Sequence, residues 1–231
     1  MKKAELFLDQ YKTLEKLVTS TYKLASDGTA ISQLERRPEF RKMKAELSYC
    51  REVRNLLQHN PKVGEDYAVE PSDSMIKLLS DIIEKIKNPM RGRDIAIPFQ
   101  KVYWKSLEDL VLPTMKDMKN NVYTHVPMLQ DGKVIGVFSD NSLFSYILEE
   151  EIVSIDNATK FLDIKKYLPL DRHPSEIFRF AKYDDLLSDI ETLFEVTFDH
   201  KERIGMVFLT ENGKETERIQ GILTPWDIIG N

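Results

Sequence analysis

Cysteine is nearly absent from this sequence, with Cys50 the single one among 231 residues. An internal disulfide is therefore impossible, and such sparse cysteine usage is typical of proteins in a reducing compartment. No apolar run approaches the roughly 20 residues that span a bilayer. Glu5 and Asp9 follow the first residues closely, which argues against a secretory signal peptide. We expect a cytoplasmic protein that does not bind membranes.

Several motifs of catalysis and cofactor binding are also missing. The sequence contains neither a P-loop nor the Gly-x-Gly-x-x-Gly pattern of dinucleotide-binding folds. Its 4 histidines are scattered without metal-ligand spacing, and no Ser-His-Asp set stands out. Cys50 lies on an apolar helical stripe, which indicates a core residue rather than a nucleophile. We expect no metal and no required cofactor.

The composition is that of an ordinary globular protein, with 42% hydrophobic and 31% charged residues. The charge is unevenly spread. Residues 1–90 hold 16 Lys and Arg against 14 Asp and Glu, whereas residues 91–231 hold 17 against 24. Pro89 and Gly92 lie at the point of change, and these residue types mark linkers. The sequence therefore predicts one domain over residues 1–88 and a second part over residues 89–231.

Residues 1–88 carry apolar side chains at helical spacing, which predicts long helices. A short turn is expected over residues 30–34, Pro38 is expected to start the second long helix, and Ser72 to cap the last one. A small antiparallel bundle follows, with spare apolar surface for a homodimer. The stripes consist of Phe7, Tyr11, Leu14, Val18 and Ala25; of Phe40, Met43, Leu47, Cys50 and Leu57; and of Met75, Leu78, Leu79, Ile82, Ile83 and Ile86.

Arg54, Asn55 and His59 lie at the end of the second predicted helix. The segment resembles the Arg-x4-6-His motif of HEPN domains, several of which are metal-independent ribonucleases that act as dimers. The resemblance implies catalytic roles for these three residues. Histidine suits the general base that takes the 2′-hydroxyl proton, and arginine suits the phosphorane charge. On one helix Arg54 and His59 lie about 140° apart, so they converge only if the helix ends between them or two subunits pair.

A structural role for the same three residues is the alternative. They would then hydrogen-bond to neighbouring helices and tie down the loop over residues 60–70. The N-terminal part lacks the strongly basic surface that phosphate-driven RNA binding requires. RNA therefore stays an alternative partner rather than the first one.

The remaining residues repeat one order of elements, helix, strand, strand, helix, and internal repeats of this kind indicate paired modules. Asp131-Gly132 between apolar runs predicts a hairpin turn in the first copy. Pro113 predicts a kink or a late start of the first helix. The predicted elements of the first copy are a helix over residues 106–118, strands over 126–130 and 133–138, and a helix start near 139. Those of the second copy are a helix over residues 184–198, strands over 204–210 and 218–223, and a helix start at 224.

Residues 221–231 run from a strand end into a helix start. Thr224 suits the N-cap and Pro225 suits the first helical position. Asp227 has two interpretations. It favours the helix dipole, or it accepts hydrogen bonds from the vicinal diol of a ribose.

This run resembles the Gly-hydrophobic-hydrophobic-Thr-x-x-Asp signature that closes a CBS module. CBS modules usually occur in tandem and bind adenosyl compounds, whose ribose and phosphate the Thr and Asp hold; the resemblance implies this role for Thr224 and Asp227. In the upstream copy Ser139 stands at the Thr position, but Ser142 stands at the Asp position. A serine cannot make the bidentate diol contact, so we expect the ligand at the second copy.

The resemblances together imply an α+β protein in which a HEPN-like bundle precedes a tandem CBS pair with two small sheets flanked by helices. The modules cover about residues 90–150 and 151–231. The expected function is regulatory sensing of AMP, ATP or another adenosyl ligand, such as S-adenosylmethionine or a cyclic dinucleotide. A nucleotide-gated ribonuclease and a non-binding scaffold are the alternatives. Further residues expected at the ligand are Ile204, Gly205, Met206, Phe178, Arg179, Phe180 and His125.

Overall fold

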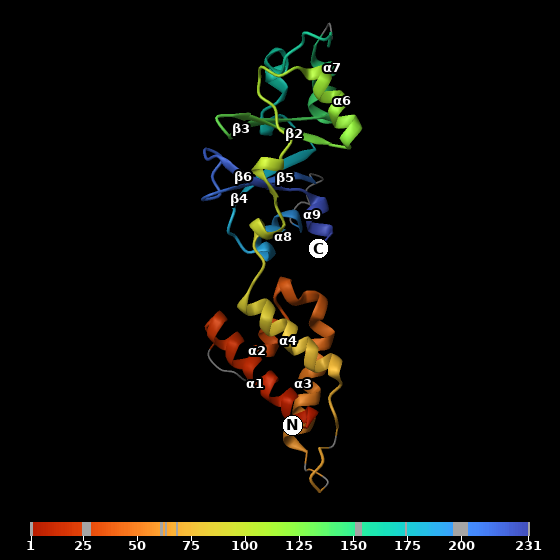
Figure 1. The fold of residues 1–231 in the computed structure, drawn as a ribbon, viewed down its shortest axis with the longest axis vertical. Coiled ribbons are helices and arrows are strands. Elements are labelled where there is room, and N and C mark those ends of the chain that lie inside the picture. Colours follow the sequence, from red (N-terminus) through yellow and green to blue (C-terminus); the bar gives the residue numbers. More distant parts are fainter. Residues whose placement is uncertain are drawn as a thin grey trace. The chain divides into compact units, whose positions relative to one another are not determined.

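The structure is a computed structural model that describes residues 2–24, 29–60, 62, 64–67, 69–150, 154–173, 175–195 and 203–230. The chain divides into two units, Met1–Met90 and Arg91–Asn231, and each is described by itself (Figure 1). Ala25 and residues 196–198, the end of the helix predicted over residues 184–198, lie outside the described residues. Within the described ranges no helix is long and apolar enough to cross a bilayer.

The first unit is a bundle of helices. It contains α1 (Lys3–Tyr22), α2 (Ala30–Leu34), α3 (Lys44–His59) and α4 (Asp73–Lys87). The predicted apolar stripes form its core, in which Phe7, Leu14, Leu47, Leu79 and Ile82 are completely buried.

Local signals in the first unit explain where these helices begin. Ser72 caps α4 as expected, because its hydroxyl accepts a hydrogen bond from the Met75 N–H at 3.3 Å. The expected start of the second long helix at Pro38 is wrong, since residues 38–43 form the 3₁₀ helix η2 (Pro38–Met43). Met43, with φ −106° and ψ 9°, leaves the helical region, so α3 begins only at Lys44.

The second unit contains two small β-sheets and the helices around them. One sheet has the strand order β1-β6-β5-β4 and the other pairs β2 with β3; β4 and β5 are parallel and the other pairs are antiparallel. The strands are β1 (Ile97–Pro98), β2 (His125–Gln130), β3 (Lys133–Ser139), β4 (Glu176–Lys182), β5 (Arg203–Thr210) and β6 (Ile219–Leu223). The α-helices are α5 (Gly92–Ile95), α6 (Val111–Asn121), α7 (Asp140–Glu149), α8 (Leu187–Glu195) and α9 (Pro225–Ile229). Short 3₁₀ helices are η3 (Phe99–Lys101), η4 (Phe161–Tyr167) and η5 (Leu170–Arg172).

The predicted repeat is confirmed as α6-β2-β3-α7 followed by α8-β5-β6-α9. Asp131 and Gly132 both have positive φ, at 53° and 79°, which is the geometry of a tight hairpin turn and the reason for a glycine there. The first helix of the repeat starts late. Pro113 is the third residue of α6. The N–H groups at the first positions of a helix have no hydrogen-bond partner within the helix, so a proline without an N–H causes no break there.

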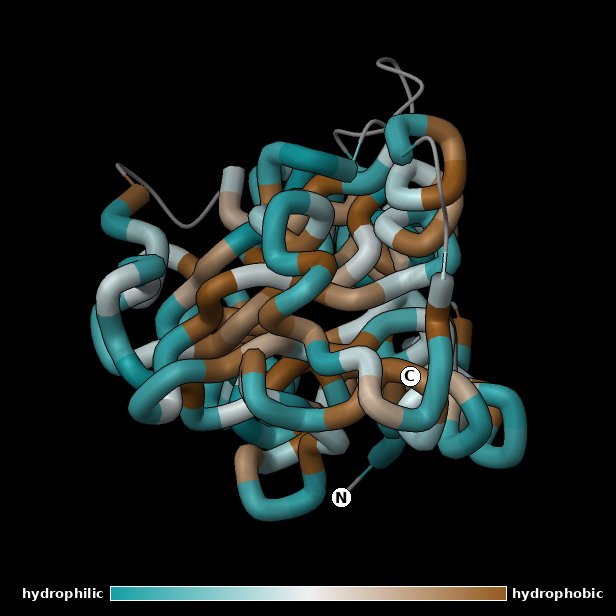
Figure 2. Tube along the Cα trace, turned by 90° about the horizontal axis from the view of Figure 1, so that it is seen from above, coloured by the Kyte–Doolittle hydropathy of each residue, from teal (hydrophilic) through white to brown (hydrophobic). Residues whose placement is uncertain are grey.

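The two sheets of the second unit face each other between two layers of helices, α6 and α7 on one side and α8 and α9 on the other (Figure 1). A shared core joins the sheets, with Leu129 and Val137 from one against Phe178, Met206 and Phe208 from the other. Figure 2 shows hydrophilic stretches, in teal, on loops that turn outward. This packing leaves the ends of four strands, β2, β3, β5 and β6, close to one another.

Candidate functional site

A cleft of about 650 Å³ opens where these strand ends meet the first residues of α7 and α9. Its volume lies in the range of small-molecule sites, roughly 300–1,000 Å³. The side chains that line it come from both copies of the repeat and from the segment that follows β1. They are Ile97, Lys101, Val102, Tyr103, Val122, Tyr123, Thr124, His125, Pro127, Ser139, Asp140, Asn141, Glu176, Arg203, Ile204, Gly205, Met206, Ile222, Thr224, Pro225, Trp226 and Asp227.

Seven of the residues predicted from the sequence line this cleft. Strand pairing brings these residues together. His125 pairs with Ser139 across β2 and β3, and Val207 pairs with Leu223 across β5 and β6, so the two strands of each hairpin lie side by side at its open end. The residues are His125, Ser139, Ile204, Gly205, Met206, Thr224 and Asp227.

Phe178, Arg179 and Phe180, also expected at the ligand, are not among the residues lining the cleft. Phe178 is buried beneath it, with its ring centroid 5.9 Å from that of His125 and 5.1 Å from that of His173. Phe180 packs on Phe208, and Arg179 is exposed. The parallel pairing of β4 with β5 turns Phe178 into the core between the sheets. Phe178 lies against residues that line the cleft, Gly205 among them. A Cβ added at Gly205 would lie 2.9 Å from the Phe178 ring.

Thr224 and Asp227 hold each other at the wall of the cleft. The Thr224 backbone N–H donates to Asp227 Oδ2 at 2.8 Å, and the Thr224 hydroxyl donates to the same oxygen at 2.7 Å. Asp227 thus closes the start of α9, as the cap interpretation requires. The same bonds fix the carboxylate in one orientation beside the cavity, which is the preorganisation that a ligand contact requires.

The equivalent position in the first copy is closed. The Ser142 hydroxyl accepts from the Ser139 N–H at 2.8 Å and donates to the Ser139 carbonyl at 2.7 Å. It therefore replaces the carboxylate in the cap. Ser142 is completely buried and does not line the cleft, so it presents no acceptor to a ligand.

Glu176, which the sequence analysis missed, is the most buried charged group of the cleft. Its side chain is 2% exposed, and Oε1 lies 3.0 Å from His125 Nε2 and 3.1 Å from Arg203 Nη2. Burial by itself would raise the pKa of this carboxyl, but the contacts with His125, Asn141 and Arg203 lower the pKa to about 2. Glu176 is therefore a carboxylate at any physiological pH.

His173 stands behind Glu176. Its side chain is fully buried, with Nδ1 3.9 Å from Glu176 Oε2 and 3.4 Å from the Ser139 hydroxyl. Burial lowers the pKa of His173, so the ring is neutral near pH 7. The sequence analysis expected only His125 of this cluster at the ligand, because the members come from β2, β4, β5 and the segment before β4.

Aromatic side chains and one lysine complete the lining. Tyr103 and Tyr123 lie with ring centroids 5.3 Å apart, and the Tyr103 hydroxyl donates to Asp117 at 2.7 Å. Trp226, next to Asp227, is 78% exposed. Lys101 follows β1, which pairs with β6 through Ile97 and Ile222, and its side chain lines the same cleft. Planar and cationic groups therefore line the same cavity as the Thr224–Asp227 pair.

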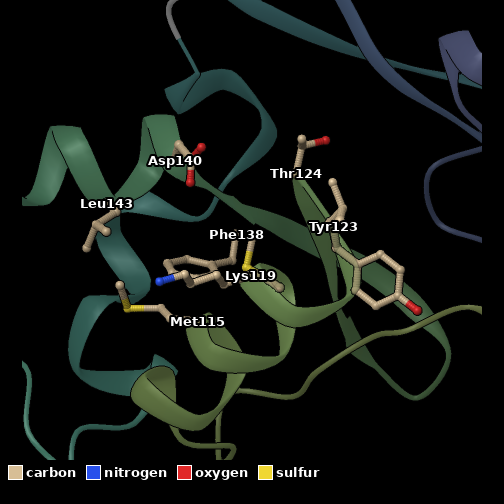
Figure 3. A pocket seen from close by; sticks show the side chains of 9 residues that line it. Met115, Lys119, Tyr123, Thr124, Phe138, Asp140 and Leu143 are labelled. Atoms are coloured by element: carbon tan, nitrogen blue, oxygen red, sulfur yellow. The ribbon is translucent and has the colours of Figure 1, made fainter.

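A side pocket of about 330 Å³ adjoins the cleft and shares Val122, Tyr123, Thr124 and Asp140 with it. Figure 3 shows Met115, Phe138 and Leu143 around the side chain of Lys119. The wall of this pocket is therefore largely apolar.

The Arg54-to-His59 motif lies on α3, which continues through His59. The helix does not end between Arg54 and His59, so the two side chains can converge only if two subunits pair. Arg54 Nη2 lies 3.3 Å from Glu15 Oε1, and its guanidinium lies 5.5 Å from the Tyr11 ring centre. Asn55 and His59 are exposed. Within one chain these contacts tie α3 to α1.

No set of three or more His, Cys, Asp or Glu side chains placed to hold a metal ion occurs in the described parts of the chain. Burial raises the pKa of the Cys50 thiol to about 11, as expected for a core cysteine.

No protein-family model and no curated protein matches this chain. Similar solved structures include a hemolysin-like protein containing a CBS domain from Oenococcus oeni, at 14% identity and a TM-score of 0.41, over 62% of this chain and 90% of that one. CBSX2 in complex with AMP is similar at 15% identity and a TM-score of 0.42, over 61% and 93%. The CBS domain pair of MJ0100, in complex with 5′-methylthioadenosine and S-adenosyl-L-methionine, is similar at 14% and 0.42, over 62% and 95%. Two of these three structures are thus described as containing a CBS domain or a CBS domain pair.

Proposed function

We propose that this protein is a ligand-sensing regulator that binds an adenosine-containing nucleotide in the cleft between two CBS-like modules. The observation that carries the proposal is the Thr224–Asp227 pair, held by hydrogen bonds of 2.7 and 2.8 Å at the wall of a cavity of about 650 Å³. A fixed carboxylate beside a cavity suits a ribose diol, because each carboxylate oxygen accepts hydrogen bonds.

The neighbouring side chains suit the other parts of such a ligand. Ile97, Val102 and Ile222 give one side of the cleft an apolar wall for a purine. Tyr103 and Trp226 offer planar surfaces on which a base can stack. Lys101 supplies a positive charge for a phosphate or a carboxylate.

The helical first unit is proposed as the output or homodimerisation element. Tyr49 and Leu56, seven positions apart on α3, are 60% and 44% exposed. Residues at this spacing share one face of a helix. Such a face suits a second copy of the chain.

The test is a thermal-shift and calorimetric screen of the full chain with AMP, ATP, S-adenosylmethionine and a cyclic di-adenosine nucleotide. We expect one of these compounds to bind, and we expect Asp227→Ala to weaken its binding free energy by about 1–3 kcal/mol. The matched control is Asp163→Ala. Asp163 accepts from the Lys160 N–H at 2.8 Å in the same kind of cap, but it does not line the cleft.

Equal binding by the parent and Asp227→Ala would contradict the ribose assignment. No binding by the parent would leave Thr224 and Asp227 as a helix cap, and the scaffold alternative would then lead.

A further inference from the structure

The corner of the cleft beside Ser139 contains its own anion. Glu176 is the buried carboxylate of this corner, and its Oε1 lies 3.0 Å from His125 Nε2 and 3.1 Å from the Arg203 guanidinium. Arg203 is 76% exposed along its side chain, so it is accessible to solvent, yet its charge is already paired.

We propose that Glu176 is a specificity-determining residue: its carboxylate occupies the place of a ligand phosphate beside His125 and Arg203, so that the cleft takes one adenosyl ligand, on its Asp227 side. The inference rests on the proposed function. It adds how many ligands the cleft binds and why the position beside Glu176 excludes a phosphate.

The two sides of the cleft differ in their contacts. On the Glu176 side, the Asn141 amide donates to the Ser175 hydroxyl at 3.3 Å, and Ser139 lies 3.4 Å from His173. On the other side, Ile97 pairs with Ile222 near the end of β6, and Thr224 and Asp227 follow that strand. The two copies of the repeat thus offer equivalent positions with different chemistry.

Electrostatics decides which position accepts a phosphate. A phosphate bonded to the Arg203 guanidinium would lie within a few ångström of the Glu176 carboxylate, and like charges at that separation repel by several kcal/mol in a partly buried site. The pKa of about 2 keeps Glu176 charged, and the buried His173 behind it is neutral. Arg203 and Glu176 therefore cancel, and the corner has no net positive charge to attract an anion.

The Glu176 side of the cleft also lacks the acceptor that Asp227 provides for a ribose diol, and this too disfavours a nucleotide there. Ser142 takes the place of the family carboxylate and is completely buried. A nucleotide on this side would lack both a diol acceptor and an uncompensated cation. The Asp227 side keeps the diol acceptor.

The experiment is calorimetric titration of the full chain and of Glu176→Gln with AMP and with adenosine. The amide keeps the shape of the side chain but removes its charge, so Arg203 and His125 become available to a phosphate. We expect one AMP per parent chain. In Glu176→Gln we expect a second AMP, or AMP affinity raised about tenfold or more, with adenosine affinity unchanged. The double variant Glu176→Gln/Arg203→Gln should lose the gain.

Two molecules of AMP per parent chain would overturn the inference, and this measurement does not depend on the folding of a variant. A folded Glu176→Gln that binds AMP as the parent does would overturn it as well. If the parent binds no adenosyl compound, the proposed function fails. AMP binding gained by Glu176→Gln would still support the role of Glu176, and a variant that also binds nothing would exclude it.

Discussion

Buried titratable side chains at the floor of the cleft link its integrity to pH. His173 and Glu176 both have lowered pKa values in the folded chain, from ordinary values of 6.5 and 4.5, that of Glu176 to about 2. In each case the unfolded chain binds its proton at higher pH than the folded chain. The stabilisation is therefore complete above the ordinary value and is lost as the pH falls toward the folded value.

We predict that the free energy of unfolding falls in two steps as the pH is lowered, below about 6.5 through His173 and between about 4.5 and 2 through Glu176. Urea unfolding at closely spaced pH values measures both steps. His173→Asn should flatten the first step, whereas replacement of the exposed His59 by Asn should leave it unchanged. An identical pH profile for His173→Asn and the parent would show that burial of this ring does not control the acid response.

At the scale of elements, α3 carries two interpretations of one motif. The contacts of Arg54 with Glu15 and Tyr11 support the structural one, since they join α3 to α1. The ribonuclease alternative requires a second copy to bring His59 toward Arg54, because both residues lie on one uninterrupted helix.

Substitutions in α3 separate these interpretations. Arg54→Ala should lower the free energy of unfolding by about 1–3 kcal/mol, because Glu15 would lose a charged partner in a half-buried place. His59→Ala, at an exposed position, should change it by less than about 0.5 kcal/mol. Chemical denaturation measures both values. Metal-independent RNA cleavage by the parent that disappears in His59→Ala would instead establish the ribonuclease alternative.

The strand pairs explain why the cleft lies where it does. Each copy of the repeat ends a hairpin at a hydroxyl residue that caps the following helix, Ser139 before α7 and Thr224 before α9. Packing the two sheets face to face brings both caps to one cavity. The copies differ at Ser142 against Asp227, and this difference is one source of the asymmetry of the cleft.

At the scale of the whole molecule, ligand binding should stabilise the second unit. A ligand at 100 times its Kd adds about 2.7 kcal/mol to the unit that binds it. We predict slower amide hydrogen exchange in β5, β6 and α9 when the ligand is present. Exchange in α1 and α4 reports whether the first unit responds, and a change there would support its role as the output element.

Unchanged exchange in β6 and α9 at saturating ligand would place the binding site elsewhere. Asp227→Ala at the same ligand concentration is the control, and it should show the exchange rates of the unliganded parent.

The sequence by itself determined the helices of the first unit, apart from the start of α3, together with the repeated hairpins and the caps at Ser72 and Thr224. These features depend on apolar spacing and on backbone bonds between residues a few positions apart, so local patterns carry them. It also indicated Thr224 and Asp227, which the structure places together at the wall of the cleft.

Only the tertiary structure decided how these parts combine. It turned Phe178 into the core, placed Lys101, Tyr103 and Trp226 at the cleft, and brought Glu176 against His125 and Arg203. The reason is that the pairing of β4 with β5 and the packing of one sheet on the other join residues far apart along the chain. A buried carboxylate becomes identifiable as a site residue only when its partners from other strands are in place.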